Sequence, residues 1–186
     1  LILAVILAVV LRTFVFSAYK VPSESMLPNL LVGDFIFAYK LPYGVDLPLV
    51  GRKWSTGRMP ERDAIVVFRH PKDKTVSYVK RVIGLPGDRI EIRKGRLLLN
   101  DKEVPNAELN SDAPIKAASG FPDFQLYIEK LSAEPHAIMA SKDLPVNDFG
   151  PVLVPTNSIF VLGDNRSTSD DSRYWGAVPQ EAIEGE

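Results

Sequence analysis

The sequence predicts a mainly β protein: a barrel-like β-domain that carries a smaller inserted subdomain and follows the end of a membrane helix. Three observations lead to this fold class. Short runs of β-branched and aromatic residues recur along the chain, many of the 15 Pro residues fall between them, and an unbroken apolar stretch comes first. With 186 residues, the chain is long enough for one medium domain or for a domain with a small insert.

The first eleven residues read LILAVILAVVL and are apolar without a break up to Arg12. A membrane-spanning helix needs about 20 apolar residues, so we interpret this stretch as the end of a longer helix with Arg12 at the interface. A cleavable signal peptide is disfavoured because no convincing small-residue cleavage site follows. A buried core strand is disfavoured because Ala4 and Ala8 suit a helix better. Residues 1–18 are therefore expected to be the end of a transmembrane segment and a juxtamembrane stretch.

Strand-like runs dominate the rest of the chain. Pro86 and Gly87 stand where a type II turn requires them, and Lys94-Gly95 is suited to the turn of a hairpin. Six runs have the length and composition of strands: Asp34–Lys40, Ala64–Phe68, Thr75–Ile83, Arg89–Arg93, Arg96–Asn100 and Ser158–Leu162.

These runs divide the chain. Residues 19–100 and 157–186 are expected to form the two parts of the β-domain. Residues 101–156 are polar and Pro-rich, with clear periodicity only at Phe124–Leu131, and are expected to form an inserted cap subdomain.

Composition excludes several classes of function. The net charge of −1 argues against a nucleic-acid partner, and the absence of Cys removes disulfides, thiolate metal sites and a Cys nucleophile. The two histidines, His70 and His136, lie next to prolines without partners at metal-ligand spacing, so no metal site is expected. A Ser-His-Asp triad would have to use one of these two histidines and is disfavoured for that reason.

The first of three unusual segments is Val21–Leu30, which reads VPSESMLPNL. Pro22 and Pro28 fix a non-helical path around Ser23 and Ser25. A serine on a rigid turn can present its hydroxyl and its own backbone N–H together, as a nucleophile beside an oxyanion site must. The alternative is a helix cap, in which a serine side chain accepts a hydrogen bond from backbone amides.

The second segment is Ser77–Arg81, which reads SYVKR within a predicted strand. Alternate residues of a strand share a face, so Lys80 lies beside Tyr78 and Val82. Burial there would disfavour the ammonium form and lower the pKa of the amine, which would make Lys80 a base. The alternative is a solvated lysine at a sheet edge whose stem covers its neighbours.

The third segment, Gly163–Gly176, reads GDNRSTSDDSRYWG and directly follows a predicted buried strand. Polar residues at this density could build a site. The alternative is a solvated loop held by Asx-turns. Six residues are candidates for a hydrogen-bonded network: Asp164, Asn165, Arg166, Ser169, Asp171 and Arg173.

In this order, after an apolar segment, the three segments resemble the bacterial type I signal peptidases, also called leader peptidases, which are serine–lysine peptidases. The resemblance runs from about Leu1 to Pro179 and is weakest between Asp101 and Asp148. The family motif SxSMxP is matched by Ser23, Ser25, Met26 and Pro28. The motif KRxxGLPGD is matched by Lys80, Arg81 and Gly84–Asp88. The motif GDNRxxSxDSRYWG is matched by Gly163–Arg166, Ser169 and Asp171–Gly176.

The resemblance implies that Ser25 is the nucleophile and that neutral Lys80 is the general base. The Ser25 N–H and the Ser23 hydroxyl would form the oxyanion hole, and no cofactor is implied. Ser169 would orient Lys80 through a hydrogen bond. Asp171 and Arg173 would pair and hold that loop, and Asp164 and Arg166 would support it further.

The implied substrates are signal-peptide-bearing preproteins, cut at the bilayer of the bacterial inner (cytoplasmic) membrane by a catalytic domain on its extracytoplasmic side. The substrate would lie extended beside Val76–Lys80 and add a strand to a sheet edge. Small residues, typically Ala, are expected one and three positions before the cut. The implied substrate-binding residues are Val21, Pro22, Leu30, Val67, Tyr78 and Val79.

The chain departs from the family pattern at Glu24, where Gly is usual, and at Asn29, where Thr is usual; Glu24 places a charge near the mouth of the cleft. Two other classes stay open. A soluble, self-cleaving repressor-type serine–lysine peptidase is disfavoured by the apolar segment and the RYWG sequence. A membrane-anchored β-domain that only binds peptides would tolerate the loss of Ser25 or Lys80.

Overall fold

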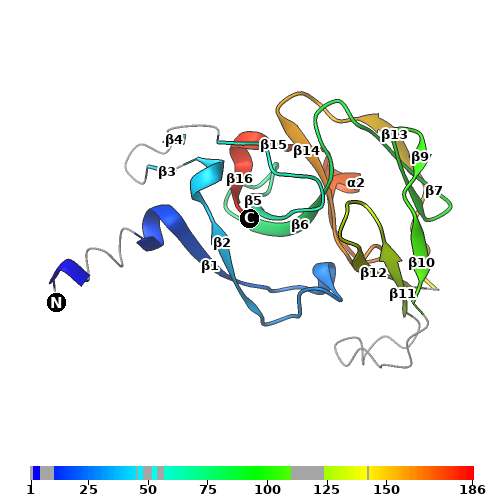
Figure 1. Cartoon of the computed structure of the whole chain (residues 1–186), viewed down its shortest axis with the longest axis horizontal. Coiled ribbons are helices and arrows are strands. Elements are labelled where there is room, and N and C mark those ends of the chain that lie inside the picture. The colour runs from blue at the N-terminus through cyan, green and yellow to red at the C-terminus, as the bar shows by residue number, and fades with distance from the viewer. Residues whose placement is uncertain are drawn as a thin grey trace.

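A computed structural model of the chain describes residues 2–4, 11–44, 46–47, 52–53, 57–109, 124–141 and 143–186. It is mainly β, as predicted, with antiparallel strands and a few short helices (Figure 1). The strands of these segments pair into five sheets. Barrel-like closure is not found among the described strands, because the edge strands of the largest sheet, β15 (Val178–Pro179) and β16 (Ile183–Gly185), do not pair with each other.

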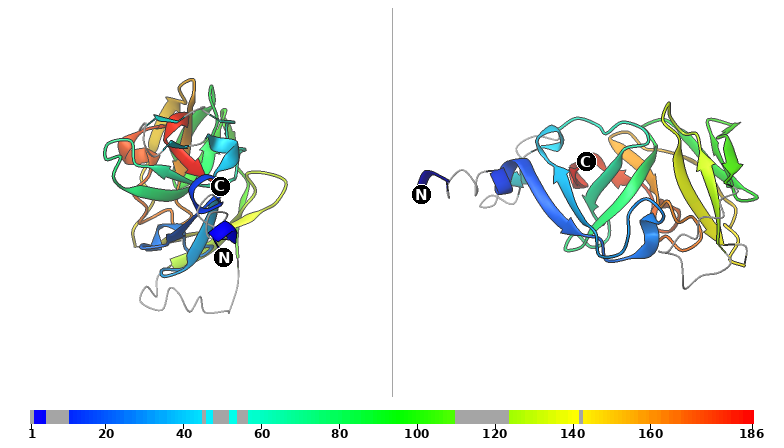
Figure 2. Two further views of the ribbon diagram at one scale, coloured as in Figure 1. Left: turned by 90° about the vertical axis from the view of Figure 1, so that its left-hand side faces the viewer. Right: turned by 60° about the horizontal axis from the view of Figure 1, so that its bottom comes forward.

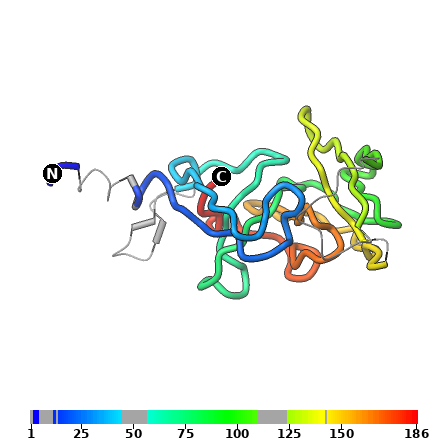
Figure 3. Tube along the Cα trace, turned by 90° about the horizontal axis from the view of Figure 1, so that it is seen from below, coloured from blue at the N-terminus to red at the C-terminus, as the bar shows by residue number. Residues whose placement is uncertain are grey.

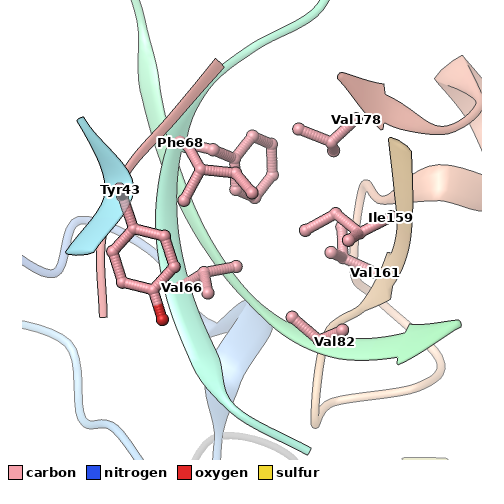
Figure 4. Packing of buried hydrophobic residues seen from close by; sticks show 8 residues of the cluster. Tyr43, Val66, Phe68, Val82, Ile159, Val161 and Val178 are labelled. Atoms are coloured by element: carbon pink, nitrogen blue, oxygen red, sulfur yellow. The ribbon is translucent and has the colours of Figure 1, made fainter. Parts of the chain in front are cut away.

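The largest sheet has the strand order β15-β14-β6-β5-β16 and confirms three predicted strands as β5 (Ile65–Arg69), β6 (Ser77–Gly84) and β14 (Ser158–Leu162). Apolar clusters cover both faces of β14, which explains the unbroken apolar run of Ile159–Leu162. The same two clusters take in Val82 and Ile83 of β6. One cluster comprises Tyr43, Val66, Phe68, Val82, Ile159, Val161, Val178 and Ile183 (Figure 4); the other comprises Ile83, Ile90, Ile92, Leu97, Val104, Val154, Phe160 and Leu162.

The second sheet has the order β13-β7-β8-β9 and contains the predicted hairpin of β7 (Arg89–Arg93) and β8 (Arg96–Leu99). The predicted turn before it is confirmed: the Asp88 N–H donates to the Leu85 carbonyl at 3.0 Å, and Gly87 has a φ of 86°, which favours glycine. The remaining strands of this sheet are β9 (Lys102–Glu103) and β13 (Phe149–Leu153).

Residues of the predicted insert form a third sheet of β10 (Asn106–Glu108), β11 (Phe124–Glu129) and β12 (His136–Ser141). The periodic run from Phe124 is thus a strand. Figure 3 shows this sheet at the end of the molecule opposite the N-terminus. Its last strand supports the loop after β14, because the Met139 N–H donates to the Asp164 carbonyl at 2.9 Å and the Arg166 N–H donates to the Met139 carbonyl at 2.8 Å.

The N-terminal part contributes a two-stranded sheet of β1 (Phe16–Lys20) and β2 (Phe35–Tyr39), which crosses below the largest sheet in Figure 1 and lies in front of it in the right-hand view of Figure 2. The remaining described elements are short: η1 (Leu11–Val15), η2 (Glu24–Met26), η3 (Leu41–Tyr43), β3 (Asp46–Leu47), β4 (Arg52–Lys53), α2 (Ser172–Trp175) and η5 (Gln180–Ala182).

Most of the predicted membrane helix, residue 1 and residues 5–10, lies outside the described residues. Within the described segments, no helix has the length and apolar character needed to cross a bilayer.

Candidate active site

Ser25 lies in η2, the short 3₁₀ helix between β1 and β2, and is 8% exposed. Ser23 occupies the N-cap position, but its side chain makes no capping hydrogen bond, so the helix-cap alternative is not realised. Instead, the Ser23 hydroxyl donates to Ser25 Oγ at 3.3 Å. The segment therefore places two hydroxyls together on a tight, Pro-bounded turn.

Lys80 reaches the same point from β6. Its Nζ lies 2.6 Å from Ser25 Oγ and 3.1 Å from the Val79 carbonyl oxygen, and 5.2 Å from the ring centroid of Tyr78. The side chain is only 3% exposed, which contradicts the alternative of a solvated edge lysine. The structure thus joins two residues that are 55 positions apart in a buried hydrogen bond.

Burial lowers the pKa of the Lys80 amine from 10.5 to about 8, and the carboxylates of Asp171, Asp170 and Asp164 offset part of this effect. A substantial neutral fraction therefore exists at mildly alkaline pH, and only the neutral amine has a lone pair. Placed 2.6 Å from a hydroxyl, that lone pair can accept the hydroxyl proton.

The loop after β14 supports the nucleophile from behind. The Asn165 N–H donates to the Ser25 carbonyl at 3.1 Å. Gly163 allows this close approach, because a Cβ on Gly163 would lie 2.4 Å from the Ser25 carbonyl oxygen and 2.2 Å from Ser169 Oγ. Position 163 therefore tolerates only glycine without a shift of the active-site backbone.

The predicted pair of Asp171 and Arg173 is present. Arg173 Nε and Nη2 donate to the two carboxylate oxygens of Asp171 at 2.7 and 2.8 Å, and the Gly163 N–H donates to the same carboxylate at 3.0 Å. Asp171 also accepts from the Arg173 N–H as the N-cap of α2. The third segment is thus a buried, hydrogen-bonded site rather than a solvated loop. The hydrogen bond from the Arg173 N–H to the Asp171 side chain does resemble that of an Asx-turn.

The predicted hydrogen bond between Ser169 and Lys80 is wrong. Ser169 is 3% exposed, and its Oγ has no hydrogen-bond partner among the described residues. The side chain packs against the α-carbon of Gly163 instead. Spacing along the sequence identified a serine near the site but could not fix the direction of its hydroxyl.

Asp164 and Arg166, the two further supporting residues, are both buried, and each pairs with a residue of another segment. Arg81 donates to both carboxylate oxygens of Asp164 at 2.7 and 2.8 Å, and Arg166 donates to both of those of Glu129 at 2.6 and 2.5 Å. Asn29 Nδ2 donates to Asp164 Oδ2 and to the Ala137 carbonyl, each at 2.7 Å. The last two contacts tie the first segment to β12 and to the third segment, and no sequence pattern indicated them.

A cavity of about 680 Å³ opens beside Ser25 and Lys80. Five of the six predicted substrate-binding residues line it, and Leu30 is not among the lining residues. Glu24 lines the cavity, in keeping with its predicted place near the mouth of the cleft. The sequence analysis missed six of the residues that line the cavity: Tyr19, Lys20, Val32, Ile36, Thr168 and Asp170.

A serine hydroxyl hydrogen-bonded to a buried lysine beside an open cavity is the arrangement that defines the class of serine–lysine hydrolases. Comparison with known proteins agrees with this class and narrows it. The family model described as signal peptidase, peptidase S26, matches residues 1–186. The chain belongs to this family.

Curated relatives include the signal peptidase I of Pseudomonas fluorescens, which is 38% identical over 96% of this chain and 66% of the relative. Another is the signal peptidase I of Pseudomonas aeruginosa, which is 35% identical over 95% of this chain and 62% of the relative. The chain thus spans about two thirds of the length of these relatives. A crystal structure of a signal peptidase I from Enterococcus faecalis V583 is 29% identical, with a TM-score of 0.41, and the match covers 69% of this chain and 96% of that chain.

Proposed function

We propose that this chain is a membrane-bound serine endopeptidase that removes signal peptides from exported preproteins, with Ser25 as the nucleophile and Lys80 as the general base. The observation that carries the proposal is the 2.6 Å contact between Lys80 Nζ and Ser25 Oγ, at an amine that is 3% exposed. Membership of the signal peptidase family supplies the substrate class.

In the proposed reaction, Ser25 Oγ attacks the scissile carbonyl carbon while neutral Lys80 takes the hydroxyl proton. The Ser25 N–H and the Ser23 hydroxyl stabilise the oxyanion of the tetrahedral intermediate. As that intermediate collapses to an acyl-enzyme, the Lys80 ammonium donates its proton to the leaving amine. Lys80 then takes a proton from the water that attacks the ester carbonyl. It returns this proton to Ser25 Oγ as the bond between Ser25 and the peptide breaks and the peptide acid leaves.

The substrate would bind along β6. This strand pairs with β5 from Ser77 to Arg81, but its pairing with β14 begins only at Arg81, so one edge of residues 77–80 is left unpaired by β14. The residues of that edge line the cavity, so an extended peptide could add there as a strand. Valines at positions 21, 67 and 79 leave room for a small side chain near the cut.

A lipid bilayer is the second proposed partner. The outer face of the β1–β2 sheet carries Phe35 and Phe37, which are 71% and 72% exposed, together with Phe16 at 45% and Tyr39 at 41%. Lys20 pairs with Phe35 on this face and could meet anionic headgroups. Because residues of β1 and β2 also line the cavity, the bilayer would lie beside the substrate site, on the extracytoplasmic side of the bacterial inner membrane.

The proposal is tested by incubating a purified preprotein with the wild type, Ser25→Ala and Lys80→Ala in detergent or lipid vesicles. The wild type should release the signal peptide in trans, and neither variant should do so while both keep the wild-type circular dichroism spectrum. Cleavage confined to the enzyme's own chain would favour the repressor-type peptidase. Binding of the preprotein without cleavage by all three proteins would favour a peptide-binding domain.

A further inference from the structure

His136 has no part in the proposed reaction, yet it lies buried between two carboxylates. It stands on β12 with its side chain 8% exposed, with Nδ1 3.0 Å from Asp63 Oδ1 and Nε2 3.4 Å from Glu129 Oε2. Asp63 precedes β5, whereas Glu129 ends β11 and pairs with His136 across the sheet. The imidazole therefore bridges the largest sheet and the insert.

The two carboxylates continue into a larger arrangement. Asp63 Oδ1 also lies 3.1 Å from Arg81 Nη1, and Arg81 in turn pairs with Asp164. Glu129 pairs with Arg166, whose Nε donates to the Gly163 carbonyl at 3.2 Å. The contacts that start at Asp63 and those that start at Glu129 therefore both end in the segment 163–166. The result is a ring of buried or nearly buried groups with alternating charge: Asp164, Arg81, Asp63, His136, Glu129 and Arg166.

Charge balance within this ring depends on His136. The ring contains three carboxylates and two guanidinium groups, so a neutral imidazole leaves a net charge of −1 and a cationic one gives zero. An uncompensated buried charge is strongly unfavourable. Burial raises the pKa of the Glu129 carboxyl, but Arg166 and His136 lower it by more, so that the pKa is about 2. This carboxylate therefore stays ionised.

The contacts of the ring nitrogens lead to the same protonation state. A neutral imidazole has one N–H and one bare nitrogen, so one of its nitrogens would point a lone pair toward a carboxylate. Both His136 nitrogens face carboxylate oxygens, and neither contact is aligned as a hydrogen bond. An imidazole with protons on both nitrogens would carry the positive charge that attracts both carboxylates.

We propose that His136, protonated on both ring nitrogens, is a positioning residue that closes this ring and thereby fixes residues 163–166 behind the nucleophile. The segment contacts the active site directly, because the Asn165 N–H donates to the Ser25 carbonyl at 3.1 Å and the Asp164 carboxylate is one of the charges that act on Lys80. The effect of His136 on cleavage rests on the proposed function, whereas its protonation state does not.

The protonation state is measured by NMR on wild-type protein labelled with ¹⁵N-histidine. The chain has only two histidines, and His70→Gln assigns the signals. His70 is an internal reference with a bare Nδ1, because this atom accepts from the N–H groups of Lys72 and Asp73 at 3.3 and 3.2 Å. At pH 7, His136 should show two protonated nitrogens. A bare nitrogen on His136 would overturn the proposal.

The consequence for catalysis is measured with His136→Gln. Its kcat for preprotein cleavage should fall about tenfold with KM nearly unchanged, because the support of the nucleophile loosens while the cavity stays intact. The ring then carries a net −1, which favours the Lys80 ammonium, so the acidic limb of the pH–rate profile should move up by roughly half a pH unit. Loss of stability alone would not move this limb.

The double variant Asp63→Asn/His136→Gln restores a neutral ring, so the acidic limb of its pH–rate profile should return to the wild-type position. His70→Gln is the matched control and should leave this limb in place. A wild-type kcat and limb in His136→Gln, or a limb that stays displaced in the double variant, would overturn the proposal. If the wild type itself cleaves no preprotein, the proposed function fails, while the NMR measurement still decides the state of His136.

Discussion

Replacing Lys80 with Met should stabilise the fold while it abolishes cleavage. The Lys80 amine is 3% exposed, and burial lowers its pKa from 10.5 to about 8. This difference means that burying the ammonium at neutral pH costs about 3 kcal/mol relative to the unfolded chain. Met has a similar length and no charge, so Lys80→Met should raise the free energy of unfolding at pH 7 by up to about 3 kcal/mol. Loss of the contact with the Tyr78 ring reduces this gain.

The gain should depend on pH in a defined direction. Because the pKa is lower in the folded state, the unfolded chain binds more protons between about pH 8 and 10.5, and the stability of the wild type rises with pH through this range. Lys80→Met lacks this rise. Urea unfolding of both proteins from pH 7 upward should therefore show their difference falling toward zero as the pH approaches 10.5.

Lys130→Met is the matched control, because Lys130 is exposed and the change should stay within about 0.5 kcal/mol at every pH. A Lys80→Met protein that is less stable than the wild type at pH 7 would refute the reasoning. So would a difference between the two proteins that does not change with pH.

Three further predictions follow from the site. Ser23→Ala should lower kcat by about 10² to 10³, whereas Ser23→Thr should keep most activity; an unchanged rate in Ser23→Ala would exclude this hydroxyl from the oxyanion hole. Gly163→Ala should lower both kcat and the midpoint of thermal unfolding, because its Cβ would lie 2.4 Å from the Ser25 carbonyl oxygen, and wild-type values for both would contradict the packing. A preprotein with Leu in place of Ala just before the cut should not be cleaved, and equal cleavage would show that Val21, Val67 and Val79 do not limit the pocket.

Two central strands were predictable from the apolar runs Ala64–Phe68 and Ile159–Leu162, and a third from the β-branched and aromatic residues of Thr75–Ile83. Ala64–Phe68, Thr75–Ile83 and Ser158–Leu162 correspond closely to β5, β6 and β14. The strands of the three-stranded sheet β10-β11-β12 gave a weaker signal. Glu129, in β11, is 1% exposed, and a buried carboxylate breaks an apolar pattern until its partner Arg166, 37 positions away, is known.

The site was predictable in its chemical groups but not in all its contacts. Resemblance and the chemistry of the residues identified Ser25 and Lys80, and the structure brings them within hydrogen-bond distance. The direction of the Ser169 hydroxyl depends on packing, and that expectation was wrong. Leu30 is not among the residues that line the cavity, and its role in substrate binding stays a prediction. His136 gave no signal, because its two carboxylate partners, from the turn before β5 and from β11, show no characteristic spacing along the sequence.

The most direct test of the serine–lysine mechanism is the pH dependence of cleavage by the wild type and Lys80→Arg. Single-turnover cleavage of a preprotein at saturating enzyme should rise with pH through an acidic limb near 8, where the Lys80 amine loses its proton. Lys80→Arg should be inactive throughout, because the guanidinium stays protonated. A limb near pH 6.5, as an ordinary histidine would give, or measurable cleavage by Lys80→Arg would contradict the assignment of Lys80 as the general base.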